Sequence, residues 1–446
     1  MAVLCCQIAS AAGEGFTTKG DGTTYTIEKL SSIAEANMIT WEAEDTPDYM
    51  PTYEIRQDIT IAEGDRFVMD EGIRVLLRNG AMLTIKGEGD LQPGKVTLID
   101  GDTGGCVRLM SATTTEVANC TFHGVGLEMM GAGATNVRHC QFREHDGSTA
   151  AALYFIQAGA ASSVEDCHFE GCRKAAIGSA ANAAQPLTIK DCTLVKNSTA
   201  NGNVPQINIT AAKPLTIKGC TVTGNPEHTM VGGIGISNFM SYEADVTIED
   251  CTIEDNRYGI GLVGPAQHIS ITGCTLLNNR YETNPMNGGS GISLYDPYQL
   301  THAVISNNHI EGSLWGVTII GCQQVNLGCL DKGSEYNPGG NVFKDNGNGG
   351  ELYDLYNNST LTVMAQNNTW NVAEQTQEEI EKVIFHKADN AALGEVVYWP
   401  AASSTGIAGT TTRGDETDGL YYDLSGAGHK HPVKGINIRN GRKVVR

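Results

Sequence analysis

The 446-residue sequence predicts an all-β solenoid, in which short parallel strands wind into coils that stack along one axis. Three observations predict this fold. A short phrase recurs every 20 to 34 residues, each copy contains a bend, and the repeated region lacks the apolar periodicity of helices. A repeat spacing of this size is typical of stacked repeats.

The recurring phrase has one apolar residue three positions before a central cysteine and another two positions after it. The residue just before the cysteine is Asn, Asp, Gly or His. These types tolerate a positive φ, so each copy is interpreted as strand, sharp bend, strand. Asparagine replaces the cysteine in the later copies. The central positions are Cys120, Cys140, Cys167, Cys192, Cys220, Cys251, Cys274 and Asn308, with weaker copies at Asn341 and Asn368.

A second apolar run follows each phrase, for example at 152–156 and 317–320. Because no crossover helix fits between the runs, each turn must consist of two or three strands. Successive turns then lie about 4.8 Å apart, and equivalent residues stack into ladders. One ladder holds Cys and then Asn, and another holds Phe, Leu, Val and Ile. A second polar ladder is expected at Asn197, Asn225, Asn256, Asn279 and Asn346.

These ladders resemble the right-handed parallel β-helix of the pectin-lyase-like superfamily, over residues 57–372. The resemblance implies a right-handed coil with inward asparagine and aliphatic ladders. Enzymes on this scaffold act on acidic polysaccharides. The phrases that mark polygalacturonase-like and pectate-lyase-like sites do not occur in this sequence, so the resemblance transfers no catalytic residue, and the fold alone does not define the chemistry.

Both ends of the repeated region need a cover, because exposed strand edges promote aggregation. Residues 13–56 are predicted to be the N-terminal cap, with Ile27, Leu30 and Ile33 on one face of a helix. Residues 373–400 are predicted to be the C-terminal cap, with a short amphipathic helix. Residues 401–418 are rich in Ala, Ser, Thr and Gly and are interpreted as a linker.

The two termini indicate export. Residues 1–12 resemble the end of a secretory signal peptide, with small residues at an Ala-x-Ala-like cleavage site. Residues 419–446 contain the phrases 421–426, 432–438 and 440–445, and they resemble the C-terminal sorting domain of type IX secretion cargo. This resemblance implies contact with secretion machinery and a location outside a Gram-negative cell, secreted or at its surface. The alternative is a small C-terminal β element that only closes the chain.

Charge and cysteine placement limit the partners. The formal net charge of −21 argues against nucleic acid as a partner. No stretch is long and apolar enough to predict a transmembrane segment. Seven cysteines share one ladder position where asparagine substitutes, so they are interpreted as buried wall residues, with no metal site. Only Cys167 with Cys172, and Cys322 with Cys329, approach zinc-site spacing. No cofactor is assigned, and a calcium requirement stays open.

Loop lengths predict a groove. The corner at 256–259 is short, whereas the corners at 225–233 and 279–291 on either side are long. The walls are predicted to contribute Glu227, His228, Arg280, Tyr281 and Glu282, above a floor of Asp255, Arg257 and Tyr258.

In this groove Arg257 and Arg280 would hold a carboxylate or sulfate, and the tyrosines would stack on sugar rings. Proton transfer would fall to Glu227, His228 or Glu282. Arg257 and Tyr258 are expected to face solvent and to contribute little to the core. The alternative interpretation is that these loops are polar only because they are solvated.

Two classes of function follow from the predicted groove. The first is a secreted or surface protein that binds a polysaccharide or surface glycan without catalysis, and the missing catalytic phrases favour it. The alternative is a polysaccharide lyase or glycoside hydrolase that acts in the groove around Arg257.

Overall fold

The computed structural model describes residues 15–41, 50–210, 213–240, 243–282, 284–322, 324–333 and 335–402, and short strands between 421 and 445. The chain divides into two units, residues 1–402 and 403–446. The predicted signal-peptide segment 1–12 and residues 403–418 of the predicted linker lie outside the described residues.

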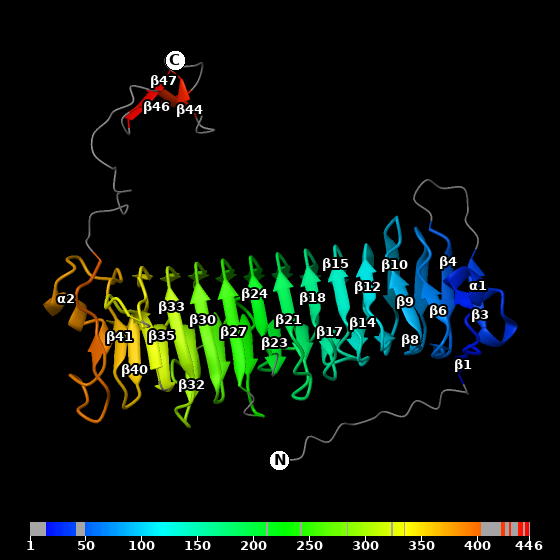
Figure 1. The fold of residues 1–446 in the computed structure, drawn as a ribbon, viewed down its shortest axis with the longest axis horizontal. Coiled ribbons are helices and arrows are strands. Elements are labelled where there is room, and N and C mark those ends of the chain that lie inside the picture. Colours follow the sequence, from blue (N-terminus) through cyan, green and yellow to red (C-terminus); the bar gives the residue numbers. More distant parts are fainter. Residues whose placement is uncertain are drawn as a thin grey trace. The chain divides into compact units, whose positions relative to one another are not determined.

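Within its described residues, the first unit is a solenoid built from three long sheets (Figure 1). Sheet A consists of β1 (Phe16–Thr17), β5 (Ile59–Ile61), β8 (Met82–Ile85), β11 (Cys106–Leu109), β14 (Gly126–Met129), β17 (Ala151–Phe155), β20 (Ala175–Ser179), β23 (Ile207–Thr210), β26 (Ile234–Ser237), β29 (Ile260–Val263), β32 (Ser290–Asp296), β35 (Trp315–Gly321), β40 (Leu355–Asn358) and β42 (Ile384–Phe385).

Sheet B consists of β2 (Thr24–Tyr25), β6 (Arg66–Val68), β9 (Glu88–Leu91), β12 (Thr115–Ala118), β15 (Thr135–Arg138), β18 (Ser162–Glu165), β21 (Leu187–Lys190), β24 (Leu215–Lys218), β27 (Ala244–Glu249), β30 (Gln267–Thr272), β33 (His302–Ser306), β36 (Gln324–Gly328), β41 (Val363–Ala365) and β43 (Val396–Val397).

Sheet C consists of β3 (Met38–Trp41), β4 (Thr52–Ile55), β7 (Arg74–Leu77), β10 (Thr97–Gly101), β13 (Cys120–His123), β16 (Gln141–Arg143), β19 (His168–Glu170), β22 (Thr193–Val195), β25 (Thr221–Thr223), β28 (Thr252–Glu254), β31 (Thr275–Leu277), β34 (His309–Glu311) and β37 (Val342–Lys344).

Each regular coil contributes one strand to sheet A, then one to sheet B, then one to sheet C, and neighbouring coils pair in parallel. This arrangement confirms the predicted all-β solenoid of stacked parallel strands.

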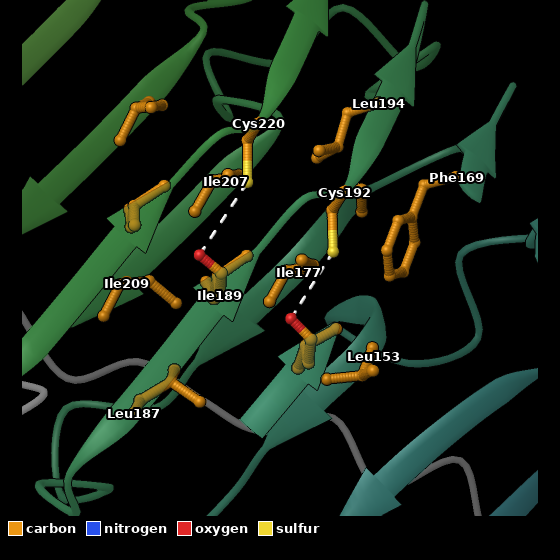
Figure 2. Close-up of a cluster of buried hydrophobic side chains, with 14 of the residues drawn as sticks. Leu153, Phe169, Ile177, Leu187, Ile189, Cys192, Leu194, Ile207, Ile209 and Cys220 are labelled. Atoms are coloured by element: carbon orange, nitrogen blue, oxygen red, sulfur yellow. Dashed lines mark hydrogen bonds between the residues drawn. The ribbon is translucent and has the colours of Figure 1, made fainter. Parts of the chain in front are cut away.

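The cysteine ladder lies at the tight bend between sheets B and C. The residue before each ladder position has a positive φ, as predicted; these residues are Asn119, His139, Asp166, Asp191, Gly219, Asp250, Gly273, Asn307, Gly340 and Asn367. The Cys192 thiol donates to the Val164 carbonyl of the preceding coil at 3.5 Å, and Cys220 donates to Ile189 at 3.8 Å (Figure 2). All eleven cysteines that the structure describes are buried and unpaired, so they are wall residues.

In the last coils asparagine replaces cysteine at the ladder position, and it makes more hydrogen bonds than cysteine. The Asn341 side-chain oxygen accepts from the backbone N–H and the Nδ2 of Asn308, at 3.1 and 3.0 Å. The Asn308 Nδ2 also donates to the Ile271 carbonyl at 3.0 Å. Each amide thus bonds to both neighbouring coils, which satisfies backbone groups that would otherwise be buried without a partner.

The apolar ladder runs beside it through sheet C. The rings of Phe122, Phe142 and Phe169 stack with centroids 4.7 Å apart in both steps, close to the usual distance between strands. Phe343 and Trp370 stack at 5.0 Å near the last coil. These rings are almost completely buried, and burial of each contributes about 1.5–3 kcal/mol.

The second polar ladder lies at the corner between sheets C and A, and one predicted member is wrong. Asn197, Asn256, Asn279 and Asn346 are buried there, but Asn225 is only half-buried. The preceding Gly224 lies so close to Asp255 and Asn256 that a Cβ would come within 2.1 Å of the Asp255 carbonyl oxygen.

Gln206 fills the position that Asn225 was expected to hold. Its Nε2 donates to Asn256 Oδ1 at 3.0 Å, and its Oε1 accepts from Asn197 Nδ2 at 3.0 Å. A side chain from a long loop therefore bridges the two neighbouring ladder members.

Short helices lie at both ends of the solenoid. Helix α1 (Ile27–Ser31) is capped by Thr26, whose hydroxyl accepts from the Lys29 N–H at 3.1 Å, and a 3₁₀ turn follows at Ala34–Ala36. Strand β3 pairs antiparallel with β4 and ends the parallel pairing of sheet C. Helix α2 (Gln377–Glu381) lies at the other end. Parallel pairing already begins at β1 and β2 and continues to β42 and β43, beyond residues 57 and 372 on both sides.

The second unit contains an antiparallel sheet in the order β45 (Gly428–His429), β44 (Tyr421–Asp423), β46 (Ile436–Arg439) and β47 (Arg442–Val445). The strands that the structure describes in this unit thus form a small C-terminal β element. Among the helices that the structure describes, none is long and apolar enough to cross a membrane.

Candidate functional site

The predicted groove residues lie on the loops that connect sheet C to sheet A. The loop between β28 and β29 is short, and the loops before β26 and β32 are long, as expected from the sequence. The short loop is tied to its neighbour because the Arg257 N–H donates to the Val231 carbonyl at 2.8 Å.

Arg257 is buried at the centre of these loops. Its Nε lies 2.9 Å from Glu282 Oε2, and the two side chains are only 10% and 9% exposed. Its Nη1 donates to Asn203 Oδ1 and its Nη2 to the Asn287 carbonyl, both at 2.5 Å. The expectation that Arg257 faces solvent is therefore wrong. One guanidinium instead joins three loops from different coils, since planar Arg offers several donors in a fixed geometry.

Tyr258 lies flat on the outer face of sheet A. A Cβ on Gly232, Gly235 or Gly261 would come within 2.1, 3.2 or 2.9 Å of its ring or hydroxyl, so these three glycines make room for it. The side chain is half-buried, and burial raises the pKa of its hydroxyl to about 12.

Asp255 and Tyr281 form a second contact. The Tyr281 hydroxyl donates to Asp255 Oδ1 at 3.5 Å. Partial burial and the charge of Glu254 raise the pKa of Asp255, although the Tyr281 hydrogen bond opposes the shift. Asp255 has φ 57°, the left-handed bend that precedes the buried Asn256. The turn thus fixes the backbone of Asp255, and the carboxylate of Asp255 is left half-buried beside the hydroxyl of Tyr281.

The other predicted residues extend from the loops. Glu227 and Arg280 are exposed, and His228 is half-buried. The His228 N–H donates to the Asn225 carbonyl at 2.8 Å, and the Glu227 N–H to Asn225 Oδ1 at 3.1 Å, so both belong to one turn. The structure thus pairs Arg257 with Glu282 and Asp255 with Tyr281. Within the described residues, no side-chain hydrogen bond or ion pair joins Glu227, His228 or Arg280 to these pairs.

A cleft of about 200 Å³ lies beside the same loop, on the outer face of sheet A. None of its lining side chains is charged, and several carry a hydroxyl or an amide. The lining residues are Pro285, Met286, Asn287, Gly288, Ser290, Ser293, Trp315, Thr318, Ile320, Tyr356 and Asn358.

Trp315 is the largest side chain in the cleft, and its position is fixed. Its Nε1 donates to the Pro285 carbonyl at 2.8 Å, which attaches the ring to the loop above. Its ring centroid lies 4.7 Å from that of Tyr353 and 4.8 Å from that of Tyr356. Sequence reasoning missed this cleft. The available indication was that Trp315 stands two residues before the buried Val317, as Tyr258 stands two before Ile260.

Small residues connect the Tyr258 region with the Trp315 cleft. Gly235, Gly261, Ser293 and Thr318 pair in register on four successive strands of sheet A. They alternate with fully buried residues such as Ile260 and therefore face outward. The ring of Tyr258 lies over Gly235 and Gly261, whereas Ser293 and Thr318 line the cleft beside Trp315.

Substitution of Arg257 tests whether the buried ion pair holds the loops. Arg257→Ala leaves the Glu282 carboxylate buried without its partner, so we expect the free energy of unfolding to fall by about 3 kcal/mol. The loop at 279–291 should also become sensitive to proteolysis. Denaturant unfolding and timed digestion measure both effects.

The matched control is Arg66→Ala, which removes an exposed ion pair with Asp90 and should change stability very little. Arg257→Met combined with Glu282→Leu should recover most of the stability that Arg257→Ala loses. Unchanged stability of Arg257→Ala would contradict the holding role.

Comparison with known proteins agrees with this architecture. The family model described as "Right handed beta helix region" matches residues 95–241 and 196–376, which together span more than half of the chain. No curated protein matches the sequence.

Among solved structures, a single mutant of the periplasmic alginate epimerase AlgG is 11% identical and covers 85% of this chain and 83% of its own, with a TM-score of 0.43. A second AlgG structure, with no mutation named, has the same identity and coverage and a TM-score of 0.38. Similarity this low says nothing about the ligand or reaction of this chain. The sequence repeats, the three sheets and the family match together establish that the chain belongs to the right-handed β-helix family.

Proposed function

We propose that this protein binds a glycan chain on the outer face of sheet A and does so without catalysis. The cleft beside Trp315 carries the proposal. Sugar rings present apolar C–H faces and a rim of hydroxyls, and this cleft offers the rings of Trp315 and Tyr356 next to the hydroxyl or amide groups of Ser290, Thr318 and Asn358.

The surroundings suit an extended ligand. Ser293 and Thr318 pair in register on neighbouring strands, so a chain can cross both coils beside Trp315 and continue onto the ring of Tyr258, which covers Gly235 and Gly261. The floor is a β-sheet whose strands are hydrogen-bonded on both sides, so little ordering of the protein is needed when the ligand binds.

Two roles are divided among the loop residues. Arg280 is exposed and would contact the glycan, including a carboxylate or sulfate on it, and Tyr281 would contact it with the exposed part of a ring that is half-buried beside Asp255. Arg257 and Glu282 are buried against each other and would hold that loop in place rather than touch the ligand.

Trp315→Ala should weaken glycan binding by about tenfold or more, because it removes the stacking surface. A glycan array identifies the ligand, and calorimetry then measures its affinity for each variant. The matched control is Trp41→Ala, which removes an exposed tryptophan from β3 at the far end of the solenoid. The proposal fails if Trp315→Ala, still folded by circular dichroism, binds as tightly as the unmodified protein.

A polysaccharide lyase or glycoside hydrolase around Arg257 is the second candidate, and Asp255 supports it. A carboxyl group with a raised pKa beside a tyrosine hydroxyl is a suitable acid–base pair. If this activity exists, the protein should release reducing ends or unsaturated products from a polysaccharide, and Asp255→Asn should abolish the release. A panel of acidic and neutral polysaccharides, each with and without calcium, tests it. No product from any of them, or full activity of Asp255→Asn, would exclude this role.

We further propose that residues 419–446 direct the protein out of a Gram-negative cell by contact with secretion machinery. The support is the resemblance of the three tail phrases to type IX sorting domains, together with their antiparallel sheet. Deletion of residues 420–446 should leave the protein in the periplasm, since the solenoid would fold without its sorting element. Fractionation and surface labelling measure this. Surface display that survives the deletion would contradict the proposal.

A further inference from the structure

A second cleft, of about 400 Å³, lies on the outer face of sheet B. It crosses four successive strands, β27, β30, β33 and β36, and is therefore separate from the Trp315 cleft on sheet A. The proposed glycan site uses none of its side chains.

Four polar side chains form its first row. Asp245 pairs with His268, His268 with His302, and His302 with Gln324, each in register on neighbouring coils. The Nδ1 of His268 donates to Asp245 Oδ1 at 3.3 Å, and the Nδ1 of His302 donates to Gln324 Oε1 at 2.7 Å. The two imidazole rings meet edge to face with centroids 5.6 Å apart. Both rings are thus oriented before any ligand arrives.

The second row and the end of the cleft add hydroxyls and one apolar surface. Thr247 and Ser270 follow two residues after Asp245 and His268 and so share the outer face. Val304 stands beside them and is 44% exposed. Asn326 Nδ2 donates to the Glu335 carbonyl at 2.8 Å, which fixes the loop that forms the end wall.

The chemistry of the lining selects a class of ligand. A carboxylate, imidazoles and amides can each bond to neighbouring hydroxyls of a sugar, and exposed Val304 can cover a C–H face. The lining contains two carboxylates, Asp245 and Glu335, and neither Lys nor Arg. A uronate or sulfated sugar would be repelled there.

We propose that this cleft on sheet B is a second carbohydrate site and that it selects uncharged glycans. The site does not depend on the proposed function of sheet A, because it lies on another sheet and would bind even if the Trp315 cleft were empty. Two sites on different sheets of one rigid solenoid would also allow one molecule to link two glycan chains.

The test uses the Trp315→Ala protein, so that the sheet A cleft does not contribute. It is titrated by calorimetry with neutral oligosaccharides of glucose, mannose and galactose, and with oligogalacturonate as the acidic counterpart. We expect a neutral oligosaccharide to bind and oligogalacturonate to bind far more weakly. When His268→Ala and His302→Ala are added, the affinity for the neutral oligosaccharide should fall about tenfold or more, since two oriented imidazoles are removed.

His139→Ala is the matched control. Its Nδ1 pairs with Asp166 at 2.9 Å on an exposed surface outside the cleft, so it removes the same kind of contact and should leave affinity unchanged. All four side chains of the first row are on the outer face, and thermal melting checks that the variants stay folded. The proposal is overturned if no neutral sugar binds the Trp315→Ala protein, if the two histidine substitutions leave binding intact, or if the acidic ligand binds better. A binding event that is lost in Trp315→Ala while another remains would bear only on the site of sheet A.

Discussion

The tight bend between sheets B and C is the constraint on which the rest of the structure depends. At this bend one residue with positive φ turns the chain from sheet B into sheet C, and the next side chain points inward beneath the carbonyl groups of the preceding coil. Buried backbone groups need partners, and the thiol of Cys192 or the amide of Asn308 supplies them. Because the same bend recurs in the successive coils from Cys120 to Asn308, each of these coils begins sheet C in register with the last. The apolar ladder, including the stacked rings of Phe122 and Phe142, follows from that register.

Because the corner between sheets B and C is nearly constant in length in these coils, loop length varies at the two other corners. The corner between sheets B and C is only one or two residues long from β12 to β34, whereas the corners that enter and leave sheet A vary in length among the same coils. The long loops before β26 and β32 use this freedom, and the buried pair of Arg257 and Glu282 keeps them ordered. Loops held in this way by a rigid scaffold are the usual location of binding residues. The candidate surfaces therefore lie on sheets A and B and not at the bend.

The features that repeat from coil to coil could be predicted from the sequence. The cysteine and asparagine ladder, the left-handed residues before it and the parallel coils all follow from one phrase whose spacing is visible in the chain. Asn225 was misplaced because Gly224 lacks the positive φ of the residues that precede the other ladder members. Gln206 reaches in instead, from a loop whose conformation no local pattern shows. Strands β1, β2, β42 and β43 were missed because two residues are too few to show a period.

The site was harder to predict because it depends on register between coils. Loop length correctly placed Arg257 near Glu282, but sequence does not show that Gly288 leaves room for the guanidinium to be buried. In the same way, Ser290 is far along the chain from Trp315 and Thr318 and shares a cleft with them only because β32 and β35 pair in one particular register.

The distribution of charge separates side chains that hold the structure from those that meet a ligand. The protein carries a formal net charge of −21, yet the cleft on sheet A has no charged side chain in its lining. The most completely buried ion pair among these loops, Arg257 with Glu282, is enclosed and already has its partners. Ions enclosed in this way are not accessible to a ligand, and separating them would leave a buried charge unpaired. A ligand in this cleft therefore meets rings, hydroxyls and amides, and this combination suits a sugar better than a highly charged polymer.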